Sequence, residues 1–228
     1  MFFPFWDPTM IIVLPALLLA IYAQLRVQST YARFSQVPIA NGLTGAQVAQ
    51  EILRRNGLSE VEIDRTDGVL SDHYDPRTRT LSLSADVHDG ISVASAGVAA
   101  HETGHAIQHA REYAPLALRS AMVPTVQFGS WLAWPLFILG LFIHSGVMVQ
   151  LGILIYSAAV AFAVVTLPVE FDASARAMRA LREEGLVSPE ELRGVRSVLT
   201  AAALTYIAAA AMAILQLLRM LLLARREE

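Results

Sequence analysis

The sequence predicts a mainly α-helical membrane protein with about four transmembrane helices and a small α+β soluble domain. First, 55% of its 228 residues are hydrophobic and its mean hydropathy is +0.49, which is too apolar for an ordinary soluble protein. Second, three long segments contain no charged residue, as the hydrocarbon core of a bilayer requires. Third, residues 31–119 combine a helix-capping pattern with turn and strand signals, which is typical of a small soluble domain.

The charge pattern and the absence of cysteine limit the function. The formal net charge is −3, and the 17 basic residues, all of them arginine, are spread along the chain, so we expect no nucleic-acid partner. Because the chain has no cysteine, any metal ion must be held by histidine and carboxylate side chains.

The first charge-free segment, residues 8–25, predicts an N-terminal transmembrane anchor within residues 1–30. Its 18 residues are enough for one span, since a membrane helix needs about 17 to 25. A secretory signal peptide is the alternative. No basic residue occurs in residues 1–7 and no small-x-small cleavage site follows, so we expect the anchor to be retained.

Residues 120–169 form the longest charge-free segment and predict a transmembrane hairpin. Its 50 residues are enough for two spans, which would meet near residues 144–146. We expect residues 170–196 to form a further helix and loop. The last charge-free segment has 22 residues and predicts a C-terminal transmembrane helix within residues 197–228.

The soluble domain begins with a predicted helix. Thr44 and Gln47 match a capping box, apolar residues follow at helical spacing, and Asn56-Gly57 would end the helix. Three short segments separated by turn residues then predict a small antiparallel sheet: residues 61–66, 69–74 and 78–84.

A helix predicted over residues 91–111 carries an H-E-x-x-H motif at residues 101–105. Residues four apart face the same side of a helix, so His101 and His105 could bind one cation, and two imidazole nitrogens suit zinc. Glu102 is displaced by one helical step and could serve as the general base of amide hydrolysis. The alternative is a solvated helix face, but the flanking residues are small and apolar, which favours a metal site.

A third protein ligand is needed, because catalytic zinc keeps three and leaves one position for water. His109 is one candidate, but it would lie about one turn, roughly 5.4 Å, beyond an ion held by the motif. Glu170, the first charged residue after the hairpin, is the better candidate. Its position alone favours the alternative, a carboxylate that merely ends a transmembrane helix. Metzincin spacing is excluded because residue 111 is arginine.

Three segments of the chain resemble the bacterial YugP-type zinc-dependent membrane peptidases: residues 72–76, 101–109 and 167–174. More distantly, the order of motif helix, transmembrane hairpin and glutamate-bearing helix is similar to that of the HtpX and CAAX-prenyl-protein metallopeptidases. The resemblance implies a zincin-like (gluzincin) catalytic domain with one Zn²⁺ per chain. By the same resemblance, the zinc ligands would be His101, His105 and Glu170, with Glu102 as the catalytic residue.

Some residues depart from that pattern or have weaker claims to a role. The distant families carry aspartate where this chain has Ser174, so only Ser174 itself or Asp172 could substitute for it. His73 or His88 could stabilise an oxyanion, although histidines near such turns are more often surface residues. Arg176 is expected to pair with Asp172, four residues earlier, rather than to act in catalysis.

The expected function is that of a membrane-embedded zinc metalloendopeptidase, which hydrolyses peptide bonds of protein substrates at the membrane surface. Its partners would be protein or peptide substrates, including membrane proteins in quality control or processing, and the lipid bilayer. A substrate peptide would pair with the strand at residues 78–84. The alternative is a non-catalytic membrane zinc-binding protein or scaffold subunit. Glu102 argues against it, because a structural zinc site needs no base.

The arginine distribution predicts a multi-pass protein of the inner (plasma) membrane with its catalytic site in the cytoplasm. With four spans and an outside N-terminus, eight arginines near span ends fall on one side, which the positive-inside rule assigns to the cytoplasm. Arg219, Arg225 and Arg226 would fall on the other side, partly offset by two C-terminal glutamates. The eight arginines are Arg26, Arg33, Arg111, Arg119, Arg176, Arg179, Arg193 and Arg196.

Overall fold

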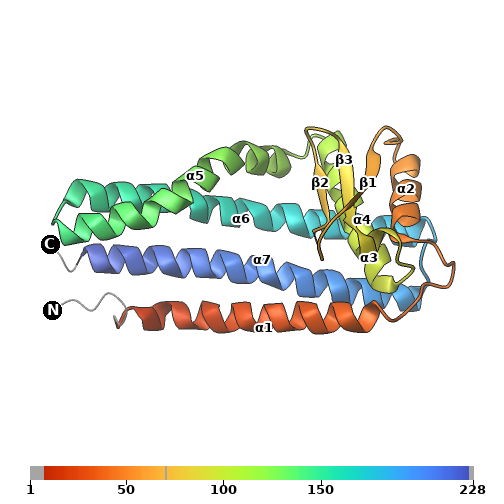
Figure 1. Ribbon diagram of the computed structural model, residues 1–228, viewed down its shortest axis with the longest axis horizontal. Coiled ribbons are helices and arrows are strands. Elements are labelled where there is room, and N and C mark those ends of the chain that lie inside the picture. Colours follow the sequence, from red (N-terminus) through yellow and green to blue (C-terminus); the bar gives the residue numbers. More distant parts are fainter. Residues whose placement is uncertain (1–7, 70, 226–228) are drawn as a thin grey trace. The chain divides into compact units, whose positions relative to one another are not determined.

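A computed structural model describes residues 8–69 and 71–225 and is mainly helical (Figure 1). Residues 1–7 and 226–228, which belong to the predicted terminal helices, and Leu70 of the predicted second strand lie outside the described residues. The elements in chain order are α1 (Met10–Phe34), α2 (Gly45–Arg55), β1 (Glu62–Thr66), β2 (His73–Asp75), β3 (Thr80–Ser84), α3 (Ala85–His88), α4 (Val93–Ala110), α5 (Ala114–Phe142), α6 (Gly146–Glu183) and α7 (Pro189–Ala224).

The chain divides into two compact units, and the four long helices contribute to both. The helical unit comprises the described parts of residues 1–23, 118–167 and 205–228. The mixed unit comprises residues 24–117 and 168–204 and contains the sheet and helices α2, α3 and α4.

Among the described residues, three helices are long and apolar enough to cross a membrane: α1, α6 and α7. Helix α5 provides a fourth candidate span if its two arms, Ala114–Val126 and Trp131–Phe142, are counted together. These arms meet at 50°. Pro135 has no N–H to donate to the Trp131 carbonyl, and Gly129 lies in the break, so the bend has a local cause. The structure thus contains three or four candidate membrane spans, which agrees with the predicted membrane protein.

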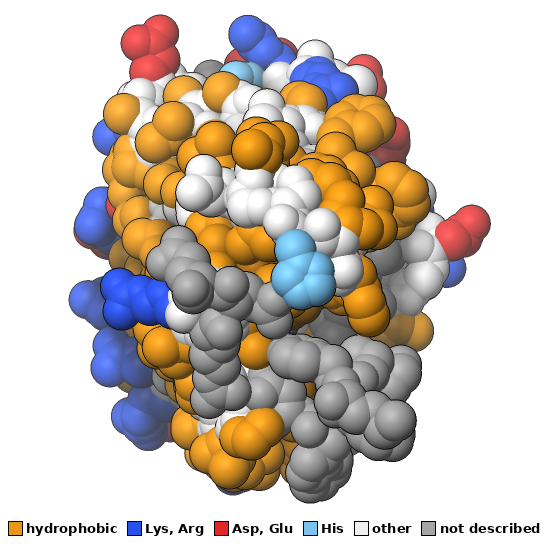
Figure 2. Space-filling model, turned by 90° about the vertical axis from the view of Figure 1, so that its left-hand side faces the viewer, with side chains coloured by type: hydrophobic (Ala, Val, Ile, Leu, Met, Phe, Trp, Pro, Cys, Tyr) orange, Lys and Arg blue, Asp and Glu red, His pale blue; other side chains and the backbone are white. Residues whose placement is uncertain are grey.

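The helical unit exposes large apolar side chains, as lipid-facing helices do. Ile11 on α1, Phe128 and Trp131 on α5 and Leu154 on α6 are each at least two-thirds exposed. Figure 2 shows one end of the molecule, where hydrophobic side chains make up most of the described surface. Such a surface would be costly in water, and it fits a bilayer.

Small residues let α5 and α6 approach closely within the helical unit. A Cβ added at Gly140 would lie 2.7 Å from the Val149 nitrogen, and one at Gly152 would lie 2.9 Å from the Ala133 carbonyl oxygen. The two helices are joined by residues 143–145, where the sequence predicts the turn.

The sheet of the mixed unit differs from the prediction. Its strand order is β1-β3-β2, with β1 parallel and β2 antiparallel to β3, so the predicted antiparallel sheet is wrong. Burial explains the order: Leu81 and Leu83 of β3 are fully buried, whereas Asp64 and Arg65 leave β1 at an exposed edge. Residues 80–82 of β3 are paired on both sides, so most of the strand at residues 78–84 has no free edge for the expected substrate pairing.

The two predicted helices of this unit are confirmed. Helix α2 has the capping box, in which Thr44 and Gln47 each accept a hydrogen bond from the other residue's backbone. Helix α4 begins after Ser92, whose side chain caps it, and is buried along most of its length against the core. The capped start places the H-E-x-x-H motif in the middle of a rigid helix.

Helices α4 and α6 approach backbone to backbone in the mixed unit. The helix expected within residues 170–196 is the last part of α6, which continues through Pro168 to Glu183. Gly104 of α4 lies against the peptide backbone at Ala173, and no side chain fits between them. This contact fixes the distance between the motif helix and α6.

We therefore expect Gly104→Ala to destabilise the protein by about 1–3 kcal/mol, or roughly 2–12 °C in apparent melting temperature. The added Cβ would lie 2.5 Å from the Ala173 carbonyl oxygen, so one backbone must move. Thermal unfolding of the purified protein in detergent measures the change. The matched control is Gly97→Ala on the same helix, where the Cβ meets only the Val195 side chain at 3.2 Å. Equal losses in the two variants would contradict the role assigned to the contact.

Candidate metal centre

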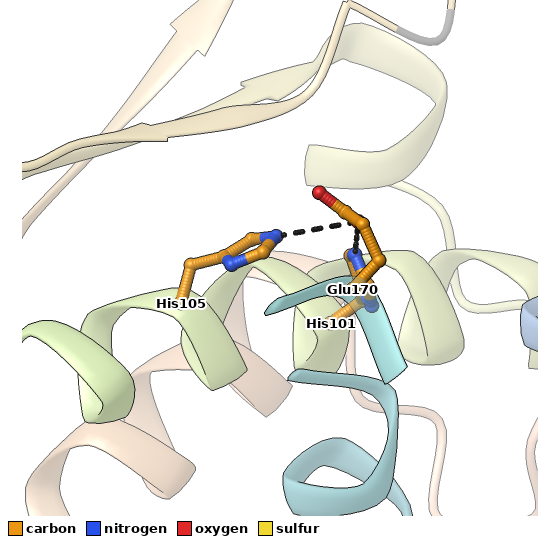
Figure 3. Close-up of side chains that lie close together, drawn as sticks. All are labelled: His101, His105 and Glu170. Atoms are coloured by element: carbon orange, nitrogen blue, oxygen red, sulfur yellow. Dashed lines mark hydrogen bonds and ion pairs between the residues drawn. The ribbon is translucent and has the colours of Figure 1, made fainter. Parts of the chain in front are cut away.

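Two histidines from α4 and one glutamate from α6 meet inside the mixed unit. His101 and His105 lie one turn apart, and Figure 3 shows both rings directed at Glu170. Each residue offers one ligand atom, and these atoms all lie within 4.8 Å of one another. Glu170 is only 2% exposed, so its carboxylate is held in place by the surrounding protein.

The geometry of this cluster fits a tetrahedral zinc ion. Oε2 of Glu170 lies 3.2 Å from Nε2 of His101 and 3.7 Å from Nε2 of His105. Ligand atoms about 2.0–2.2 Å from a tetrahedral ion are about 3.4 Å apart, so both distances are close to what zinc requires. The two imidazole rings are nearly perpendicular, at 84°, so their nitrogens approach from different directions. Two nitrogens and one oxygen leave one tetrahedral position for a water molecule or substrate.

Hydrogen bonds to the far side of each imidazole fix how the rings face the cluster. Oγ of Ser174 lies 3.1 Å from Nδ1 of His101, and Oε1 of Gln108 lies 3.0 Å from Nδ1 of His105. When each Nδ1–H donates to these oxygens, both Nε2 atoms keep a lone pair for a metal ion. Of Ser174 and Asp172, the two residues considered for a supporting role, Ser174 is the one that contacts a ring of the cluster.

Gln108 also ties α4 to α6. Its side chain is fully buried, and Nε2 donates to the Val169 carbonyl oxygen and to Oδ2 of Asp172, each at 2.8 Å. The same Asp172 oxygen accepts a 2.6 Å hydrogen bond from Nε of Arg176, which confirms the predicted Asp172–Arg176 pair. The sequence reasoning missed Gln108. The available signal was its spacing, because a residue three positions after His105 shares its face of the helix.

The electrostatics of the cluster favour a cation. Burial alone lowers the pKa of His105, but the Glu170 carboxylate 3.7 Å from its Nε2 and the negative charge of Glu102 outweigh this effect and raise the pKa above its usual value. Two carboxylates thus stabilise positive charge at this imidazole. A divalent ion would use the same attraction in place of the proton. Glu102 itself is 8% exposed and lies beside the first ligand on α4.

The other histidines considered from the sequence lie outside this cluster. Nδ1 of His109 is 2.9 Å from the Tyr74 hydroxyl, which links α4 to β2. His73 contacts the backbone oxygen of Ser71, and His88 pairs with the neighbouring Asp89. In the described part of the chain, the grouping of potential metal ligands contains His101, His105 and Glu170 and none of these three.

Comparison with known proteins supports a zinc peptidase. No solved structure matches the chain, so the zincin-like fold and the likeness to the HtpX and CAAX-prenyl-protein peptidases remain predictions. The chain is 43% identical over 212 residues to the protein named "Putative membrane protease YugP" of Bacillus subtilis (strain 168). The match covers 93% of this chain and 94% of that relative. Residues 9–225 match the family described as "Putative neutral zinc metallopeptidase", and the chain belongs to this family.

Proposed function

We propose that this chain is a membrane-embedded zinc metalloendopeptidase whose single Zn²⁺ is held by His101, His105 and Glu170. The assembly of these three side chains from two helices supports the proposal most strongly. Zinc is the metal of the family, and the donor set leaves one position open, as in catalytic rather than structural sites. When bound, zinc polarises a substrate carbonyl and makes a water molecule more acidic.

Glu102 is the proposed general base. It follows the first ligand by one residue, so it lies beside the cluster on α4 rather than within it. It would accept a proton from the attacking water and return it to the nitrogen of the departing amine. Glu102 is only 8% exposed, so bulk water has little access to its carboxylate.

Strand β2 is the proposed place for the substrate main chain. It is an edge strand of the sheet and packs against α4, and the Tyr74 hydroxyl contacts His109 of that helix. A peptide added to this edge would form main-chain hydrogen bonds that do not depend on its sequence. We therefore propose β2 in place of the strand at residues 78–84.

The proposed substrates are protein segments at the membrane surface, with membrane-protein quality control or processing as the biological role. The family implies peptide substrates and a membrane context. Helix α6 supports a site near the bilayer, because Glu170 directly follows its charge-free segment in an unbroken helix.

We further propose a plasma-membrane location with the site on the cytoplasmic side. The eight arginines near span ends support this orientation. Arg219, which would lie on the other side, donates from Nε to the Thr9 hydroxyl at 3.1 Å and lies over the Trp134 ring. It therefore contributes to helix packing in the helical unit and does not oppose the orientation as a loop arginine would.

Glu102→Gln should retain zinc and lose peptide cleavage by about 10²-fold to 10⁴-fold, because the side chain moves a proton without binding the metal. Zinc content and cleavage of an unfolded protein by the purified full chain measure the two effects. Glu183→Gln makes the same change on an exposed residue and serves as the control. Equal turnover in wild type and Glu102→Gln would rule out this mechanism and favour a non-catalytic zinc protein.

Glu170→Ala should weaken zinc binding by more than 100-fold, because a direct ligand is lost. His109→Ala should weaken zinc binding by no more than roughly 10-fold to 100-fold, the loss typical of residues that contact ligands but not the metal. Zinc affinity is measured by competition with a chelator in detergent solution. A zinc-replete Glu170→Ala protein beside a zinc-free His109→Ala protein would reverse the ligand assignment.

Single cysteines should report the orientation, since the chain has none of its own. Gly146→Cys lies at the exposed start of α6 with no atom near its Cβ, and Ser59→Cys is exposed in the mixed unit. In intact cells an impermeant thiol reagent should label residue 146, and residue 59 only after lysis. The opposite pattern would place the site outside the cell.

A further inference from the structure

A cavity of about 670 Å³ adjoins the motif helix in the mixed unit. We call it the α4–β2 pocket. It is separate from the three proposed zinc ligands, none of which lines it. Its walls come from α4, from β2 and from the segment that precedes β1, and include Leu58, Val61, Tyr74, Ala106, His109 and Ala110.

The pocket lies on the same face of α4 as the proposed base. Ala106 and His109 follow Glu102 by four and seven residues, and both intervals return to the same side of a helix. At 1.5 Å per residue they lie about 6 Å and 10 Å further along the axis. An extended peptide advances about 3.3 Å per residue, so the pocket is about two or three residues from a bond cleaved beside Glu102.

Strand β2 brings a substrate side chain to the pocket. Tyr74 lines the pocket, and its hydroxyl lies 2.9 Å from Nδ1 of His109, so the strand borders the opening. Side chains of an extended peptide alternate between its two faces. A peptide paired with β2 would therefore direct every second side chain towards α4, and one of these would meet the pocket.

The lining defines the chemistry of that side chain. Leu58, Val61 and Ala106 are buried and apolar, so the floor offers no polar partner from its side chains. At the rim, Arg79 lies 3.9 Å from Glu60 and Glu112 adds a second carboxylate, which gives a formal rim charge of −1. A large apolar side chain matches the floor, and an acidic one is repelled by the rim.

We propose that the α4–β2 pocket is a specificity subsite that accepts a large apolar side chain two or three residues from the cleaved bond. This inference rests on the proposed peptidase function and adds a substrate class to it. Main-chain pairing along β2 makes cleavage broadly tolerant, and the pocket selects for apolar segments. Such segments are abundant in membrane proteins and in unfolded chains.

The test maps cleavage sites in an unfolded protein, using the purified full-length enzyme in detergent with zinc. Wild type should show enrichment of leucine, phenylalanine or methionine at one position two or three residues from the cut. Ala110→Phe places a ring in the pocket from an exposed position and should remove this enrichment. Two peptides that differ only by leucine or alanine at that position give a second measure. The ratio of their kcat/KM values should be about 10-fold or more for wild type and close to one for Ala110→Phe. Ala32→Phe, an exposed alanine of the mixed unit outside the pocket, is the control.

A second variant guards against a folding defect in Ala110→Phe. Glu112→Lys changes the formal rim charge from −1 to +1 and should let glutamate be accepted at the same position. If Ala110→Phe keeps the apolar enrichment and Glu102→Gln forms no fragments, the subsite is overturned and the proposed peptidase function stands. Fragments that also form with Glu102→Gln would overturn the proposed function and the subsite together. Enrichment at no position in wild type would also overturn the subsite.

Discussion

The backbone contact between Gly104 and Ala173 is the constraint on which the candidate site depends. A helix can place two histidines on one face, but it cannot supply a third ligand at tetrahedral geometry from its own next turn. The carboxylate must come from another element, and only a close crossing lets a short glutamate side chain reach. Gly104, between the two histidines, removes the one Cβ that would keep α6 away. The glycine of the motif thus permits the close crossing that brings Glu170 to the histidines.

The same crossing buries polar groups beside partners on the other helix. A glutamate that is 2% exposed is costly as an anion unless cations or donors surround it, and the two imidazoles provide this. Gln108 joins the two helices by bonding His105 on one side and Val169 and Asp172 on the other. The network orients the imidazole and also resists separation of α4 from α6, so stability and site geometry share the same bonds.

Much of this arrangement could be predicted from local sequence, and the rest required spatial information. The charge-free segments, the Thr44 capping box and the motif helix follow from short-range rules, and the structure has the corresponding helices. The sheet order did not follow, because strand signals show that strands exist and not which of them pair. Glu170 is 65 residues beyond His105, across a helical hairpin. Its position made it a candidate, and only the resemblance favoured it over a carboxylate that ends a helix. Gln108 offered only its spacing of three residues from His105, which any polar residue at that position of the helix would share.

The proposed topology gives α6 two roles that a soluble peptidase would assign to separate elements. Its first part is charge-free as far as Val169, and its depth in a bilayer would be set by hydrophobic matching. Glu170 is the next residue, without a break in the helix. A carboxylate inside the hydrocarbon would be strongly disfavoured, so the end of the apolar segment limits how deeply the ligand can lie. Bilayer thickness would then help to fix the height of the cleavage site. Substrates anchored in the same membrane would present their juxtamembrane segments at that height without a separate docking domain.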